Sequence, residues 1–177
     1  MKITTGHFPS SLTRLAKALH YVIHYANKLN LTLNATRLLK IIFFAEVKAL
    51  YEGVGLISKV KMVKARSGPV PDQHKEALNW LVRENKIIPT KRSNGMSYRS
   101  LFEPNVSLFT INQINILSNI TSLIGDNFTA GMISGNIHEN RIWNLVKMGQ
   151  EIPLAAYLPG SETCLKLTKE ELISFTT

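Results

Sequence analysis

The residues of this 177-residue chain that could bind a metal or move a proton are five histidines and a few carboxylates. His20 and His24 have the i, i+4 spacing with which a helix presents two imidazoles to one metal ion, but no third ligand lies near them in sequence. His138-Glu139 begins like the zinc-protease signature H-E-x-x-H, yet Ile142 stands where the second histidine belongs. We therefore predict no metal site.

Other catalytic signatures are also missing from the sequence. It has no G-x-S-x-G elbow, no P-loop and no G-x-G-x-x-G turn, and the glycine pair Gly131 and Gly135 has no strand before it and no lysine after it. Asp126 and His138 are a possible acid and base couple that nothing in the spacing requires. Cys164, the only cysteine, is best read as a small apolar side chain, since it can form neither an internal disulfide nor a cysteine cage. The chain is predicted to be no enzyme and to need no cofactor.

Length and composition indicate the kind of fold that positions these residues. A chain of this length that is 45% hydrophobic buries a proper core, so we predict a single domain over residues 1–177, with 1–10 as an N-terminal arm and 159–177 as a C-terminal extension. The longest apolar run, residues 41–45, is interrupted by Glu46 and Lys48 and is too short to span a bilayer. The first residues lack the apolar stretch of an export signal, which favours the cytoplasm.

The formal charge of +9 is unevenly distributed. Counting Lys and Arg against Asp and Glu, residues 1–58 carry +5, residues 59–99 carry +7, and residues 100–177 carry −3. The positive charge of the first hundred residues favours an acidic partner, either nucleic acid or an acidic protein surface. Charge alone does not choose between the two.

Apolar spacing predicts several helices. Leucine, valine, isoleucine and alanine recur every three or four residues from Leu12 to Leu29, with Ser10 or Ser11 as N-cap. Asn34 is predicted to cap a second helix that ends near Gly53 and is apolar on more than one face, as a central helix would be.

Residues 59–66 have the partly alternating pattern of an extended segment. It leads into Ser67-Gly68-Pro69-Val70-Pro71, which we interpret as a rigid corner because two prolines fix the backbone. Asp72 is placed to cap a helix over 72–85. Asn94-Gly95 then predicts a β-hairpin over residues 86–102.

Capping residues and glycines predict the helices after residue 104. Thr110 and Gln113 form a capping box for a helix ending at Gly125, and Thr129 can cap a short helical segment after it. A helix within 136–148, an extended stretch at Ile152-Pro153, and a short final helix over 168–175 complete the prediction. The predicted fold is mainly α, a compact multi-helix single domain with a small β-hairpin.

Four segments in this order resemble a known family: residues 37–46, residues 65–71, residues 134–140, and the run from Trp143 to Pro153. Together they are similar to the Panacea domain, also called the SocA-like antitoxin domain, which often reads KLLYFA, then yGPV, then a Ser-x-x-x-His stretch ahead of a Trp, a Gly and Ile-Pro. The resemblance spans residues 12–158. It departs from the pattern at Phe43-Phe44, where Tyr-Phe is usual, and at Arg66-Ser67, where an aromatic or small residue is usual.

The resemblance implies a mostly helical domain that neutralises a cognate protein toxin by binding it, without catalysis. Such domains are commonly encoded beside the toxin and have relatives in prophages, and one relative delivers its toxin to an ATP-dependent protease. The matching residues are interpreted as structural: Phe43, Phe44, Gly68, Val70, His138, Trp143, Gly149, Ile152 and Pro153.

Binding is predicted instead at exposed residues around the corner and the hairpin, because Arg and Tyr are favoured interface anchors and a rigid corner lowers the entropic cost of association. These residues are Lys64, Arg66, Pro69, Asp72, His74, Lys75, Arg92 and Tyr98. The alternative function is a nucleic-acid-binding regulator that uses the helix over 72–85 and the basic hairpin, as a winged-helix protein does.

Overall fold

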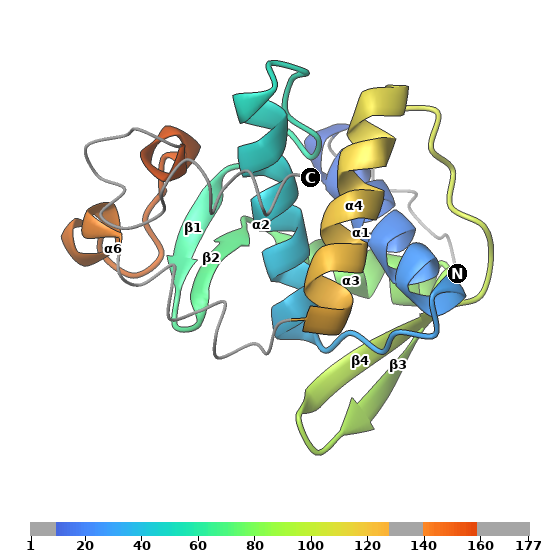
Figure 1. Ribbon diagram of the computed structural model, residues 1–177. Helices are drawn as coiled ribbons and strands as arrows, with labels where there is room; N and C mark the ends of the chain where they lie inside the picture. Colours follow the sequence, from blue (N-terminus) through green and yellow to red (C-terminus); the bar gives the residue numbers. More distant parts are fainter. Residues whose placement is uncertain (1–9, 128–139, 159–177) are drawn as a thin grey trace, which may run out of the picture.

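The computed structural model describes residues 10–127 and 140–158 (Figure 1). Most of the expected N-terminal arm and the whole C-terminal extension lie outside these residues, and Ser10 is already the first residue of a helix. Thr129, His138, Cys164 and the expected last helix also lie outside. No helix in the described part of the chain is both long and apolar enough to cross a membrane.

Helices form the centre of the fold. The first, α1 (Ser10–Lys28), and the second, α2 (Ala35–Tyr51), have the predicted positions, and Asn34 caps α2 by accepting a hydrogen bond from the Arg37 amide (2.9 Å). α4 (Ile111–Asn127) packs against both, and α3 (His74–Arg83) packs against α1. Figure 1 shows α2 between these helices on one side and the strands β1 and β2 on the other.

Two antiparallel hairpins lie against the helices, whereas the sequence predicted one. The expected hairpin is formed by β3 (Ile87–Arg92) and β4 (Gly95–Ser100). Its two-residue loop is Ser93-Asn94, and Gly95 alone among these three has a positive φ, of 111°. The fold is therefore a helical assembly with more strand than expected.

The second hairpin corrects the prediction of a corner at residues 67–71. β1 (Met62–Ala65) was expected to be extended, but the two prolines are inside β2 (Gly68–Pro71), which pairs with it. The Asp72 amide donates to the Lys61 carbonyl, so the amides of residues 68, 70 and 72 face β1 and the proline nitrogens face away. A proline at every second position thus costs no ladder hydrogen bond.

Two helix boundaries also differ from the sequence prediction. Asp72 does not cap α3: the N-cap is Gln73, at a φ of 59°, and the Asp72 carboxylate accepts a hydrogen bond from the Gln73 amide instead. Gly125 does not end α4, because it is a buried helical residue whose missing Cβ leaves room for Leu31. The capping box of Thr110 and Gln113 is confirmed by both of its hydrogen bonds, at 3.2 and 3.3 Å.

The C-terminal described segment completes the core. α6 (Arg141–Leu145) ends earlier than expected, and the 3-10 helix η1 (Leu154–Tyr157) follows an extended stretch around Ile152, which is buried. Phe43 of α2 packs edge-on against Tyr157, with ring centroids 5.0 Å apart. The segment therefore covers the side of α2 that the other helices leave open.

Glu46 of α2 is a buried carboxylate that organises the loop after the helix. It accepts hydrogen bonds from the backbone amides of Ile57 (2.7 Å) and Ser58 (2.5 Å) and from the Ser58 hydroxyl. Burial raises the pKa of this carboxyl, and the three donors oppose that shift.

We expect Glu46→Gln to lower the free energy of unfolding by about 1–3 kcal/mol, because the amide NH₂ faces a hydrogen-bond donor and leaves it unsatisfied. Glu52→Gln is the control on the same helix, since it removes only a partly exposed pair with Lys48 and should cost no more than about 0.5 kcal/mol. Urea denaturation measures both. Equal losses would contradict the organising role of Glu46.

Candidate functional site

Two of the four segments that carry the family resemblance, residues 65–71 and the run from Trp143 to Pro153, come together around β1. The Lys64 amide donates to the Gln150 carbonyl (2.9 Å), the Gly149 amide donates to the Lys64 carbonyl (2.8 Å), and the Ile152 amide donates to the Met62 carbonyl (2.8 Å). β1 thus lies between β2 and residues 149–152. Segments 85 to 90 residues apart in sequence are joined by main-chain hydrogen bonds.

Lys64 has an internal role that the sequence did not indicate. Its ammonium group lies 4.5 Å from the centroid of the Trp143 ring and donates to the carbonyls of Trp143 and Val146 (2.9 Å to the latter). These contacts hold α6 against β1. Lys64 is therefore occupied within the chain, although it was predicted to bind a partner.

Lys40 is a buried lysine on α2 beneath the hairpin of β1 and β2. Its side chain is 1% exposed, and its Nζ donates to the Pro69 carbonyl at 2.9 Å. That carbonyl is on the edge of β2 that faces away from β1, so Lys40 satisfies a group that the hairpin cannot. Burial lowers the pKa of Lys40 to about 7.

A pocket of about 220 Å³ adjoins Lys40 and includes Arg66, Ser67 and Val70 in its lining. Pro69 is buried, and Gly68 has a φ of 107°, a conformation that favours glycine. The turn at residues 66–67 is therefore held from below by α2. Arg66, one of the predicted binding residues, is exposed in this turn and lines the pocket.

The other predicted binding residues are spread over two further places. Asp72 and Lys75 are exposed around the start of α3, and the His74 ring bonds to the Pro71 carbonyl (2.8 Å). Arg92 and Tyr98 lie together on the second hairpin, in a cleft that shares no lining residue with the Arg66 pocket. The structure thus places Arg92 and Tyr98 on one hairpin, with their side chains on opposite faces of it, and separates both from Arg66.

The cleft at the second hairpin has a volume of about 540 Å³ and is mostly polar. We call it the hairpin cleft; its lining residues are Asn27, Asn30, Leu31, Thr32, Thr90, Arg92, Ser97, Tyr98 and Arg99. Arg92 Nε donates to the buried Ser97 hydroxyl (3.2 Å), and Ser97 in turn donates to the Thr90 carbonyl (3.2 Å). Partial burial raises the pKa of Tyr98, so its hydroxyl stays protonated and can donate a hydrogen bond at neutral pH.

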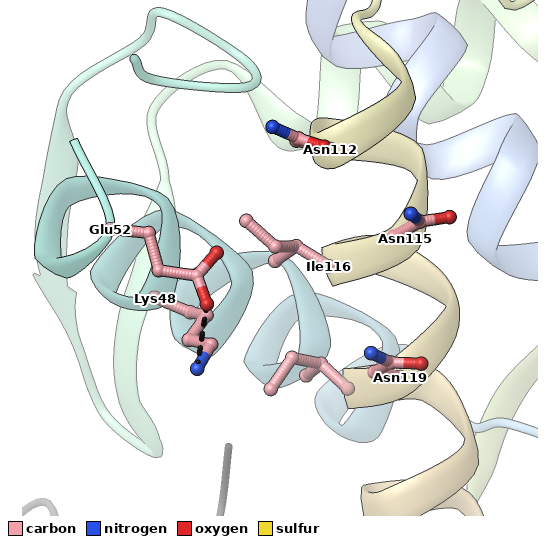
Figure 2. Close-up of a pocket in the computed structure, with 7 residues that line it drawn as sticks. Lys48, Glu52, Asn112, Asn115, Ile116 and Asn119 are labelled. Atoms are coloured by element: carbon pink, nitrogen blue, oxygen red, sulfur yellow. Dashed lines mark ion pairs between the residues drawn. The ribbon is translucent and has the colours of Figure 1, made fainter. Parts of the chain in front are cut away.

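A third hollow, between α2 and α4, was not predicted. Figure 2 shows Asn112, Asn115 and Asn119 one after another along α4, which together with the pair of Lys48 and Glu52 on α2 line this hollow. The Lys48 Nζ is 2.9 Å from Glu52 Oε1. The signal in the sequence was three asparagines at i, i+3 and i+7 of a predicted helix, a spacing that places them on one face.

The residues that match the family pattern have mostly interior positions. Phe43, Val70, Trp143 and Ile152 are buried, and Phe44 is half-buried. Gly149 has a φ of 79°, and Pro153 is the N-cap of η1. Asn140, at the end of the third matching segment, accepts from the Ile142 amide and donates to the Ala156 carbonyl, both at 2.9 Å.

The two histidines of α1 differ in their surroundings: His20 has hydrogen-bond partners, whereas His24 Nε2 is buried without one among the described residues. His20 Nε2 lies 3.0 Å from the Ser100 hydroxyl and 3.1 Å from the Phe102 carbonyl, and His24 Nε2 lies 3.8 Å from a Glu103 carboxylate oxygen. Burial is the main cause that lowers the pKa of both histidines. Within residues 10–127 and 140–158, no three His, Cys, Asp or Glu side chains are grouped as a metal site requires.

Comparisons of the chain with protein-family models, with characterised proteins and with solved structures found no match.

Lys40 predicts a pH dependence of stability. Its pKa falls from 10.5 to about 7 on folding, so the unfolded chain binds more protons over that window and the free energy of unfolding should rise as pH rises from 7 to 10. The gain from this group is at most about 1.4 kcal/mol per pH unit. Urea titrations measure the free energy of unfolding of the native chain and of Lys40→Met at each pH. We expect the value for the native chain minus the value for Lys40→Met to rise over this range, because all other groups are common to both. Parallel curves would show that Lys40 has an ordinary pKa.

Proposed function

We propose that this chain is a non-enzymatic cytoplasmic antitoxin that neutralises a cognate protein toxin by direct binding. The observation that carries the proposal is the hairpin cleft, where Arg92 and Arg99 project from the same face of a hairpin that extends beyond the helices (Figure 1). The similarity of the sequence to the SocA-like antitoxin domain supports the same conclusion.

The side chains of the cleft are suited to a protein partner. Arg99 is exposed and makes no ion pair with any described residue, and Arg92, exposed on the same face of the hairpin, donates a side-chain hydrogen bond to Ser97. Arg and Tyr are enriched among residues that dominate binding energy, and cations attract an acidic surface before contact. An acidic face on the toxin is the complementary partner.

The hairpin is held in place before any partner binds. The Ser100 amide donates to the Asn27 side chain (2.8 Å), the Leu101 amide donates to the Lys86 carbonyl (3.0 Å), and a β-bridge joins Asn34 to Ser97. A surface that is ordered in the free protein loses little entropy on association. The cleft is therefore a better docking surface than an unanchored hairpin would be.

The test is the double variant Arg92→Glu with Arg99→Glu. We expect it to weaken toxin binding by about 30-fold or more, because hot-spot residues contribute about 2 kcal/mol or more. The toxin is identified as a protein that co-purifies with the tagged chain after nuclease treatment and arrests growth when expressed alone, and binding is measured by calorimetry. Rescue of growth should fall in parallel.

Two controls locate the interface. Arg83→Glu reverses an exposed charge at the end of α3 and should leave affinity unchanged. Arg66→Glu tests the pocket beside Lys40. A loss confined to Arg66→Glu would move the interface to that pocket, and failure to recover any toxic partner would overturn the antitoxin proposal.

Nucleic-acid binding is the second candidate, and the observation that favours it is the same hairpin, where Lys91, Arg92 and Arg99 are exposed. If three phosphates are contacted, affinity for a DNA duplex should fall roughly 40-fold between 50 and 200 mM salt. The double variant at Arg92 and Arg99 should lower the slope of log affinity against log salt by about two. Fluorescence anisotropy measures both quantities. Specific, submicromolar binding at 200 mM salt would favour a regulator, whereas weak binding that is lost with salt is expected of an antitoxin.

A further inference from the structure

The groove between α2 and α4 presents a row of unused hydrogen-bonding groups. Asn112, Asn115 and Asn119 are exposed on one face of α4, and none of their side chains makes a hydrogen bond to a residue that the structure describes. Figure 2 shows their side chains one after another along the helix. Each carboxamide offers both donors and an acceptor.

Asparagine at these positions does not favour the stability of the helix. It is among the less favourable residues in a helix interior, because its side chain competes for backbone hydrogen bonds. α4 has its N-terminal cap in Thr110 and Gln113, so the three amides have no capping role. Their presence on one exposed face is better explained by a ligand than by the helix.

The rest of the groove is apolar or neutral. Ile116 and Ile120 lie beside the amides and are nearly buried, and Ile116 points toward α2 in Figure 2. On the opposite side, Lys48 and Glu52 form an ion pair and neutralise each other. The hollow has a volume of about 180 Å³.

These features select one class of ligand. A phosphate or a nucleic acid requires cations, and Lys48, the one lysine among the described residues of the groove, is paired with Glu52. A divalent cation requires several carboxylates, and Glu52 is the only one that the described residues contribute to the lining. An uncharged polypeptide main chain matches, because its alternating N–H and C=O groups pair with carboxamides, and its apolar side chains can contact the isoleucines.

The spacing agrees with an extended chain. At a rise of about 1.5 Å per residue, the seven residue steps from Asn112 to Asn119 span about 10.5 Å along the helix axis. An extended peptide covers that length with about three residues. We propose that the groove between α2 and α4 binds an extended, uncharged peptide segment of a protein partner, with Asn112, Asn115 and Asn119 hydrogen-bonding to its main chain.

This site goes beyond the antitoxin function, since it specifies the form of the ligand and not its origin. It shares no lining residue with the hairpin cleft. The two proposals can therefore fail independently, and the experiment below uses no toxin.

The experiment selects ligands from a random library of 12-residue peptides displayed on phage, with the full chain as bait. Enriched peptides are synthesised, and their affinities are measured by calorimetry for the native chain and for the triple variant Asn112→Ala, Asn115→Ala, Asn119→Ala. We expect at least about a tenfold loss of affinity in the triple variant. Asn79→Ala, at an exposed position of α3, is the matched control and should bind as the native chain does.

Two readouts separate recognition from folding. The Tm of the triple variant should stay the same or rise, because alanine favours helix more than asparagine does. N-methylation of the central peptide groups of the ligand should abolish binding, while alanine replacement of a single ligand side chain should have a smaller effect. The proposal is overturned if no peptide is enriched, or if the enriched peptides bind the triple variant and the native chain equally.

Discussion

The fold depends on two ionisable side chains inside its central helix. Lys40 and Glu46 are each 1% exposed, and neither is neutralised by an opposite charge in direct contact: Lys40 donates to the Pro69 carbonyl, and Glu46 accepts from the amides of Ile57 and Ser58. A buried polar group without a partner costs several kcal/mol, so these bonds constrain where the chain can go after α2. The helix thereby fixes the loop at residues 57–58 and the outer edge of β2 together.

Fixing β2 has consequences across the small sheet. β1 is bound to β2 on one side and to residues 149–152 on the other, so the position of the C-terminal segment follows from the position of the hairpin. The contact of Lys64 with Trp143 adds a side-chain bond to the same arrangement. A half-buried lysine that seemed suited to a partner thus joins two segments of the chain, and two segments of the family pattern, residues 65–71 and 143–153, meet at β1.

The main helices and the second hairpin could be predicted from sequence, because apolar periodicity, the capping box at Thr110 and the Asn-Gly signal act locally. The first hairpin could not, because prolines usually argue against a strand, and here they are tolerated only because their nitrogens face away from β1. The N-cap of α3 was predicted at the wrong residue, because Gln73 adopts a left-handed backbone conformation that is uncommon for glutamine. The grouping of Arg92 with Tyr98 followed from the hairpin, whereas the separation of Arg66 from them required the tertiary structure.

The two proposed surfaces differ in the range over which they act. The arginines of the hairpin cleft attract an acidic partner over distances up to about the Debye length, about 8 Å at physiological salt, and so influence the rate and orientation of encounter. The amides between α2 and α4 act only at hydrogen-bond distance, and main-chain recognition discriminates little between sequences. For a partner that contacted both surfaces, the charged cleft would determine which partner is bound, and the neutral groove would contribute to the lifetime of the complex. Charge reversal in the cleft would then reduce the association rate, while loss of the amides would increase the dissociation rate.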